Sequence, residues 1–306
     1  MDGVLVMDKP RGVTSFWVVQ RVRRITGQRK AGHAGSLDPL ATGLLLVCLG
    51  RATKIVQFLM EGEKVYRGAM TLGLITDTYD ADGRVVEERP IPPLTLEQVQ
   101  DAAAAFVGPL MQEPPPFSAA KHKGQPLYKL ARRGITVKKE PRQVVVHSFE
   151  ILAVNPPQVE FQVRCSKGTY VRSLAHELGL RLGCGAILSR LTRTGCGPFT
   201  LDDAVGLEEL EEAGREGRLG DLVVPIARAL AHLPAVEVER AVAQAVRQGA
   251  GVAADLVAPR CSQGGFVRLV SGGELVAVVP CLGCGEGGPP LLKPARIWPQ
   301  GVPAGG

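Results

Sequence analysis

The sequence lacks the segments that place a protein in or across a membrane. Among its 306 residues, no apolar run approaches the ~18–20 residues that a membrane-spanning helix needs. The first residues include Asp2 and Asp8 and show no basic stretch followed by an apolar one, the pattern of a secretory signal. No internal repeat is present, and 45% hydrophobic with 22% charged residues is an ordinary globular composition. We therefore expect a cytoplasmic protein with no membrane partner.

The sequence also contains too few candidate ligands for a metal site. Cys281 and Cys284 form one C-x-x-C pair, with Cys261 upstream, but no fourth Cys or His follows at zinc-site spacing. The other four cysteines have apolar or small neighbours and are interpreted as buried thiols: Cys48, Cys165, Cys184 and Cys196. The sequence predicts no bound metal.

Acidic residues are scarce in two stretches of a chain whose net charge is +6. Residues 1–60 contain only three of them, and residues 121–142 contain only Glu140. The basic residues in these stretches are Lys9, Arg11, Arg21, Arg23, Arg24, Arg29, Lys30, Arg51, Lys54, Lys121, Lys123, Lys129, Arg132, Arg133, Lys138, Lys139 and Arg142. Because Lys and Arg neutralise phosphates, both clusters indicate a nucleic-acid partner. The acidic run between residues 202 and 216 is interpreted as a solvated face.

One carboxylate, Asp38, lies in the segment GHAGSLDPLATG, residues 32–43. Glycine frees the backbone and proline fixes φ, so this composition predicts a shaped loop. A carboxylate on such a loop near His33 is a candidate nucleophile or general base. The same spacing also fits a helix cap, with Asp38 preceding a helix that runs from Pro39 toward Cys48.

This segment resembles the active-site motif of the TruB family of tRNA pseudouridine synthases along its whole length. The resemblance continues in the same order through DKPRGVTS (8–15), KVYR (64–67), TDTYDADG (76–83) and GTYVRS (168–173). Five collinear motifs are far more specific than one. They imply an α+β pseudouridine synthase catalytic domain, with a mixed, mainly antiparallel sheet and flanking helices. They also imply a substrate, uridine 55 in the TΨC stem-loop of tRNA.

Apolar periodicity agrees with mixed α and β structure. Strands are predicted at 4–7, 65–72, 143–154 and 158–165. One helix is predicted with Ser15 as its cap, and others are expected to begin near Thr53, Thr95 and Tyr170, the one from Thr95 ending at Gly108-Pro109. The composition changes after Pro225, which divides a catalytic domain, 1–230, from a β-rich module, 231–300. A helix at 238–247 and strands at 266–270, 274–279 and 293–298 are expected there. The order of this module, which includes GGELVAVV (272–279) and LLKPARI (291–297), resembles the PUA RNA-binding domain at the C-terminus of TruB proteins.

The resemblance also implies the roles of individual residues. Making pseudouridine breaks the N-glycosidic bond, rotates the uracil and joins its C5 to C1′; this needs no redox change or energy input, so no cofactor is expected. Asp38 corresponds to the nucleophile, with attack at C1′ and at C6 both left open. Arg172 corresponds to its cationic partner, and Tyr66 to the ring that stacks on the base and assists C5 proton removal. Tyr170 and Leu191 correspond to residues that line the base pocket.

Other site residues carry two interpretations. His33 is a candidate acid–base catalyst, but the resemblance favours a space-filling role beside the flipped nucleotide. A calcium-binding loop is suggested by the spacing of Asp77, Asp80 and Asp82, but the glycine spacing of an EF-hand is incomplete. We therefore expect a turn in which Asp side chains form hydrogen bonds with the backbone of the turn itself. RNA contacts are assigned to Lys9, Lys64, Lys121, Lys123, Lys129, Arg132 and Arg133, the last five within a basic insertion at 118–142 that would close on the RNA.

Two other functions fit part of the pattern. The catalytic subunit of an RNA-guided pseudouridylase shares the Asp38 motif, and a non-catalytic RNA-binding or RNA-folding protein shares the basic clusters. The basic insertion favours a stand-alone enzyme, and the presence of Asp38, Tyr66 and Arg172 favours catalysis. With no heptad or interface stripe, we expect a monomer without an obligatory protein partner.

Overall fold

The computed structural model describes residues 1–115, 121–122, 125–126, 140–260, 265–281, 291–299 and 301–302. Lys121 begins the short strand β8 (Lys121–His122), which pairs with β9 (Gln125–Pro126). The RNA contacts expected at Lys123, Lys129, Arg132 and Arg133, and the Cys261 and Cys284 positions, lie outside the described residues. Across the described residues, no helix is long and apolar enough to span a membrane.

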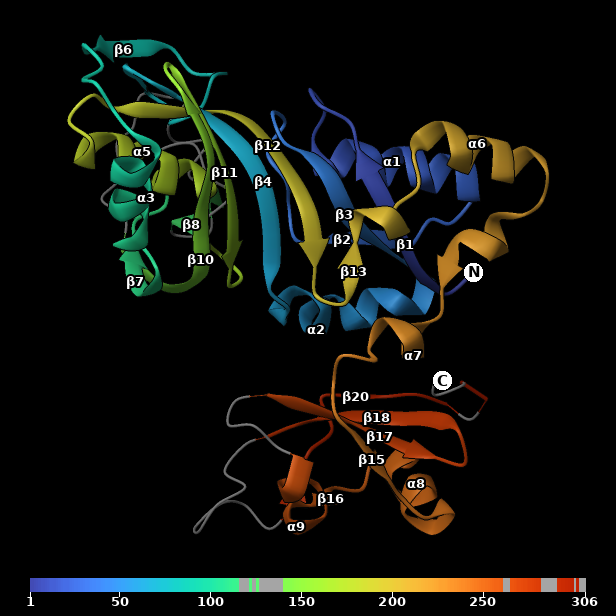
Figure 1. Ribbon diagram of the computed structural model, residues 1–306. Helices are drawn as coiled ribbons and strands as arrows, with labels where there is room; N and C mark the ends of the chain where they lie inside the picture. The colour runs from blue at the N-terminus through green and yellow to red at the C-terminus, as the bar shows by residue number, and fades with distance from the viewer. Residues whose placement is uncertain are drawn as a thin grey trace.

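A mixed sheet runs through the larger part of the molecule (Figure 1). Its strands follow the order β14 (Val223–Val224), β1 (Gly3–Lys9), β3 (Thr42–Leu49), β12 (Ala186–Cys196), β4 (Lys64–Leu72), β11 (Gln158–Cys165), β10 (Arg142–Asn155) and β7 (Gly108–Gln112). β2 (Ala31–Ala34) pairs with β3, and β13 (Phe199–Thr200) pairs with β12. Every neighbouring pair is antiparallel except β12 with β3. The predicted mixed, mainly antiparallel sheet is confirmed.

Helices cover the sheet at both ends, α3 and α5 at one and α1 and α6 at the other (Figure 1). Their bounds are α1 (Ser15–Thr26), α3 (Leu96–Ala104), α5 (Val171–Arg181) and α6 (Leu207–Arg215). α1 buries Val18, Val19 and Val22 against β1 and β3, as the helical spacing of its apolar residues requires. α5 buries Leu174 and Leu178 beside β12 and thereby fixes the direction of its first turn, which enters the site.

Three predicted boundaries were wrong. Thr14, not Ser15, caps α1, because the Ser15 hydroxyl is bonded to the loop that carries Asp38. α3 ends at Ala104, and Gly108-Pro109 begins the edge strand β7, a place that tolerates proline because the outer N–H needs no partner. The helix expected from Thr53 is a 3-10 turn over Gly50–Ile55 followed by α2 (Val56–Glu61).

The C-terminal residues form a second sheet of four strands. Its order is β15 (Ala235–Glu237), β17 (Phe266–Ser271), β18 (Glu274–Pro280) and β20 (Arg296–Ile297), with α8 (Arg240–Arg247) packed on it. The strand expected over 293–298 is thus shorter than predicted. Trp298 is buried and shares a cluster with Phe58 and Ile226, so this sheet packs against α2 and against α7 (Ile226–Ala229).

The structure explains why the GHAGSLDPLATG segment has a glycine at position 43. The φ of Gly43 is +93°, and a Cβ added there would lie 2.4 Å from the Arg193 carbonyl oxygen. We expect Gly43→Ala to lower the free energy of unfolding by about 1–3 kcal/mol from its backbone conformation alone, with the carbonyl clash adding to this. Gly32→Ala in the same segment is the matched control, because no atom lies within 4 Å of its added Cβ. Equal urea midpoints for the two variants would contradict this account.

Candidate active site

Asp38 lies on the loop that joins β2 to β3. The helix-cap interpretation of this residue is wrong, because residues 42–49 form a strand. The start of α1 holds the loop in place: the Ser15 hydroxyl accepts from the Leu37 N–H at 2.8 Å and donates to the Leu37 carbonyl at 3.1 Å. The Gly12 N–H also donates to the Pro39 carbonyl at 2.8 Å. Asp38 is therefore presented on a braced loop.

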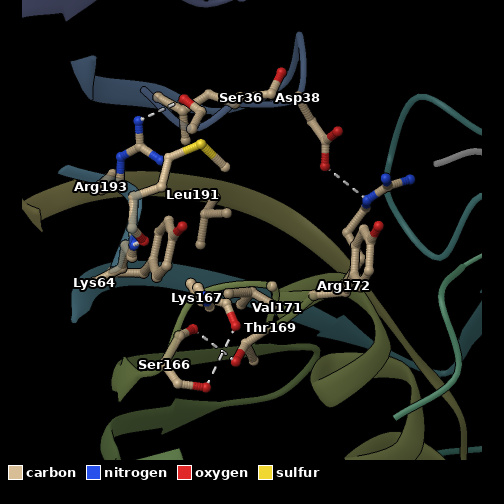
Figure 2. A pocket seen from close by; sticks show the side chains of 16 residues that line it. Ser36, Asp38, Lys64, Ser166, Lys167, Thr169, Val171, Arg172, Leu191 and Arg193 are labelled. Atoms are coloured by element: carbon tan, nitrogen blue, oxygen red, sulfur yellow. Dashed lines mark hydrogen bonds and ion pairs between the residues drawn. The ribbon is translucent and has the colours of Figure 1, made fainter. Parts of the chain in front are cut away.

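Arg172 forms an ion pair with Asp38, its Nε lying 2.9 Å from Oδ2. Figure 2 shows the guanidinium and the carboxylate facing each other. Arg172 is the second residue of α5, and its side chain is only 5% exposed. The other side of the guanidinium donates through Nη1 to Asp80 Oδ2 at 3.1 Å and to the Thr78 carbonyl at 3.0 Å. One buried cation therefore bridges two carboxylates.

Asp80 belongs to the turn between β5 (Leu74–Thr76) and β6 (Val85–Glu88). Its Oδ1 accepts from the Thr78 hydroxyl at 2.6 Å and from the Asp82 N–H at 3.1 Å. Asp77 Oδ1 similarly accepts from the Arg84 N–H at 2.9 Å, so the predicted turn with Asp side chains bonded to their own backbone is confirmed. The contact of Asp80 with Arg172 was missed, because three acidic residues in one turn do not reveal which of them faces inward.

Tyr79 holds this turn in an unusual backbone conformation. Its φ is +64°, the one positive value at a non-glycine residue in the described ranges, and a bulky side chain adopts such a φ only where its surroundings impose it. The ring stacks on His176 at 3.8 Å between centroids and 7° between planes. His176 lies one helical turn after Arg172, so the stack ties the turn to the helix and brings Thr78 and Asp80 to the same guanidinium nitrogen.

The electrostatic environment of Asp38 contains opposing effects. Burial in the surrounding protein raises the pKa of the Asp38 carboxyl, Arg172 lowers it, Asp80 raises it and Lys9 lowers it; the net pKa lies above the ordinary value. The side chain is nonetheless 45% exposed, because it faces a pocket open to solvent. Asp38 is therefore accessible to a substrate.

A pocket of about 280 Å³ opens in front of Asp38 (Figure 2). This is near the lower end of small-molecule sites, ~300–1,000 Å³, and suits a group as small as one nucleobase. Its walls include Met60, Tyr66, Val171 and Leu191, with residues 166–170 along one side. The lining therefore combines flat or apolar side chains, Tyr66 and Leu191 among them, with the Asp38–Arg172 ion pair.

Two buried polar residues that the sequence did not reveal shape this pocket. Arg193 is 1% exposed, and its guanidinium donates to the Leu44 carbonyl at 2.7 Å and the Gly35 carbonyl at 3.3 Å, which ties the Asp38 loop to β12. Gln112 is also 1% exposed and makes two hydrogen bonds, 2.7 and 3.1 Å, with the backbone of Tyr170. Tyr170 is therefore held at the start of α5, beside Arg172.

Two of the lysines assigned to RNA, Lys9 and Lys64, are buried. Lys9 is 0% exposed, and its Nζ donates to the carbonyls of Pro10 at 2.9 Å, Val13 at 2.8 Å and Pro39 at 3.4 Å. Burial lowers the pKa of Lys9 to about 8, with Asp38 opposing this effect. A phosphate contact does not agree with this position, and Lys9 instead joins the Asp38 loop to residues 10–13. Lys64 lines the pocket, but its Nζ donates to the Met60 and Gly62 carbonyls at the end of α2.

His33 lies on β2 and is half-buried, outside the pocket lining. Burial and the Arg193 cation lower the pKa of His33, which favours the neutral ring. No described residue forms a hydrogen bond with its buried Nδ1. This position on the strand before the Asp38 loop, outside the pocket lining, is compatible with the space-filling interpretation.

Comparisons with known proteins agree with this geometry. Residues 23–171 match the family model described as TruB family pseudouridylate synthase (N terminal domain), and residues 172–231 match tRNA pseudouridylate synthase B C-terminal domain. The fold and the matched models define the protein as an enzyme of the pseudouridine synthase class. Within that class, the chain belongs to the TruB family.

Individual relatives are similar over almost their whole length. The tRNA pseudouridine synthase B of Syntrophotalea carbinolica is 44% identical, with 91% of each chain covered. That of Nitrosococcus oceani is 45% identical, with 90% of this chain and 88% of the relative covered. Among solved structures, a chain of a Cbf5–Nop10–Gar1 complex superposes with a TM-score of 0.76 at 28% identity, covering 98% of this chain and 86% of that one.

Proposed function

We propose that this enzyme isomerises uridine 55 in the TΨC loop of tRNA to pseudouridine. The observation that carries the proposal is the Asp38–Arg172 ion pair at 2.9 Å, set in a pocket of about 280 Å³. The substrate follows from the relatives, which are named tRNA pseudouridine synthase B at 44–45% identity. The enzyme flips the uridine out of its loop, at a cost of a few kcal/mol in unstacking that pocket and phosphate contacts offset.

Asp38 acts as the nucleophile that supports cleavage of the glycosidic bond, by attack at C1′ of the ribose or at C6 of the uracil. Its ionised form is required, and Arg172 favours that form while fixing the direction of the carboxylate. Tyr66, Tyr170 and Leu191 hold the uncharged base between flat and apolar surfaces, on which it turns before C5 joins C1′. Asp80 is a positioning residue that acts through Arg172.

We further propose that catalysis and RNA binding are carried by different parts of the chain. Residues 1–230 form the catalytic domain, and the basic insertion at 118–142 closes on the RNA. Residues 231–300 form a PUA-like RNA-binding domain, supported by a separate sheet and by a hydrophobic cluster of its own that includes Val267, Leu269 and Leu292. The enzyme works in the cytoplasm as a monomer on free tRNA, without an obligatory protein partner.

The function is tested by tritium release from tRNA transcripts that carry 5-³H-uridine. We expect release from a transcript with uridine 55, and none from a transcript in which cytidine replaces it. The likeness to a chain of the Cbf5–Nop10–Gar1 complex supports a second candidate, a catalytic subunit that needs partners. Failure of the wild-type enzyme on bare tRNA would favour that candidate, and release from both transcripts would assign a different uridine.

The pH dependence of catalysis follows from the raised pKa of Asp38. Because the ionised carboxylate is the active form, kcat/KM should fall as the pH falls through this pKa, which lies above the ordinary value of 3.8. The acidic limb of the profile reports the free enzyme. Binding of tRNA to the Asp38→Asn variant, measured over the same pH range, separates this effect from weakened association. A rate that is constant down to pH 4 would contradict the assignment.

A further inference from the structure

Two aromatic side chains on α1 are unusually exposed. Phe16 is 54% exposed and Trp17 is 38% exposed, and no other Phe or Trp in the described ranges belongs to the exposed class. Each has an arginine over its ring at 5.9 Å from the centroid: Arg23 over Phe16 and Arg21 over Trp17. An exposed ring paired with a guanidinium is a surface on which a nucleobase stacks and a phosphate binds.

The two pairs differ in charge. Arg21 forms an ion pair with Glu211 on α6, the helix that also carries Glu208, Glu209 and Glu212. Arg23 forms no ion pair with any described carboxylate; it donates to the Ala31 carbonyl at 2.6 Å. Phosphate is therefore attracted to the Phe16 pair and repelled from the acidic helix beside the Trp17 pair.

The Phe16–Arg23 pair also lies beside the active site. Ser15, next to Phe16, is bonded to Leu37, and Arg23 is bonded to Ala31. α1 consequently runs opposite to residues 31–37, and the pair flanks the strand that leads into the Asp38 loop. No acidic residue occurs between Lys9 and Leu37, and the exposed basic residues nearby are Arg11, Arg24, Arg29 and Lys30.

We propose that Phe16 and Arg23 form a second RNA-contacting surface, which stacks an unpaired base of the substrate loop and binds its phosphate. This proposal rests on the proposed function, since it takes the RNA substrate from there. Stacking on aromatic rings is the usual way in which proteins hold unpaired RNA bases, and the position of the pair suits nucleotides next to the flipped uridine. The Trp17–Arg21 pair takes no part.

The test measures the affinity of the full-length protein for a tRNA transcript by filter binding. Phe16→Ala should raise Kd about 5-fold or more, given that base–aromatic stacking is worth ~1–3 kcal/mol, whereas Trp17→Ala, the matched control, should stay within 2-fold of wild type. Arg23→Gln should lower the slope of log Kd against log salt by roughly 0.7–0.9, the value for one phosphate contact. Phe16→Tyr should retain wild-type affinity.

Kinetics add a second readout: Phe16→Ala should raise KM and leave kcat at saturating tRNA within about 2-fold of wild type. Equal affinities for Phe16→Ala, Trp17→Ala and wild type would overturn the proposal, and so would equal losses in both variants. A Phe16→Tyr variant as weak as Phe16→Ala would also overturn it, because stacking would not be the cause. If the wild-type enzyme releases no tritium, the proposed function fails, whatever the binding data show. If the wild-type enzyme releases tritium and Phe16→Ala binds tRNA with wild-type affinity, only the proposed Phe16–Arg23 surface is refuted.

Discussion

Asp38→Asn is expected to lower the rate of pseudouridine formation by at least ~10⁴-fold, the scale seen when a nucleophile is removed from a catalytic group that acts as a unit. The amide is nearly isosteric with the carboxylate, but it is uncharged and a poor nucleophile. The affinity for tRNA should change less than about 2-fold, because the basic surface that binds phosphates is untouched. Single-turnover tritium release and filter binding measure the two effects.

The same variant should be at least as stable as wild type at pH 7. The folded protein raises the pKa of Asp38, so folding favours the protonated form, and the ionised carboxylate opposes folding above that pKa. A neutral amide removes this penalty, while Arg172 keeps its ion pair with Asp80 at 3.1 Å. Asp101→Asn on the exposed side of α3 is the matched control. A lower melting temperature together with weaker tRNA binding would make Asp38 a structural residue.

The second large effect is expected for Arg172→Lys, with a loss in kcat of about 10²–10³-fold, typical of losing one preorganised electrostatic contact. Lysine keeps the charge, but one ammonium does not reproduce a planar fork that reaches Asp38 through Nε and Asp80 through Nη1. The KM for tRNA should change little, since Arg172 is buried. Arg190→Lys is the matched control, because Arg190 is 63% exposed and pairs with Glu160 at the surface.

Removing the cation altogether separates catalysis from stability. Arg172→Met leaves the buried Asp80 without its ion-pair partner, and we expect the free energy of unfolding to fall by ~3–5 kcal/mol, as for other broken buried pairs. Adding Asp80→Asn should recover part of that loss without restoring activity. Additive losses in the double variant, measured by urea denaturation, would show that the two residues are not coupled.

Local patterns that need no distant partner were predictable. The alternation in β4, the hairpin of β10 and β11 around residues 155–157, and the start of α3 at Thr95 all agree with the structure. These features depend on backbone preference and on hydrophobic period, which a short window contains. The predicted cap at Ser15 and the predicted helix end at Gly108-Pro109 were wrong, because a distant hydrogen bond and a distant strand compete with those preferences.

The residues that support the site, in contrast, could not be predicted from local patterns. Asp80 and Arg172 are 92 positions apart, and Arg193 and Leu44 are 149 apart. Nothing in a short window distinguishes Asp80 from Asp77 or Asp82, nor Arg193 from the exposed Arg190. Lys9 was assigned to RNA because it is basic, yet three carbonyls surround its ammonium inside the protein.

The sequence by itself determined the family and most strands and helices. It also singled out Asp38 as the proposed catalytic carboxylate and Arg172 as its proposed cationic partner. Motif identity and periodicity are properties of the chain alone, so no tertiary structure was needed for these predictions. Only the tertiary structure decided which polar side chains are buried and against what. Sheet register and helix packing bring distant segments together, and a charged residue becomes a support or a surface contact according to the partners it meets there.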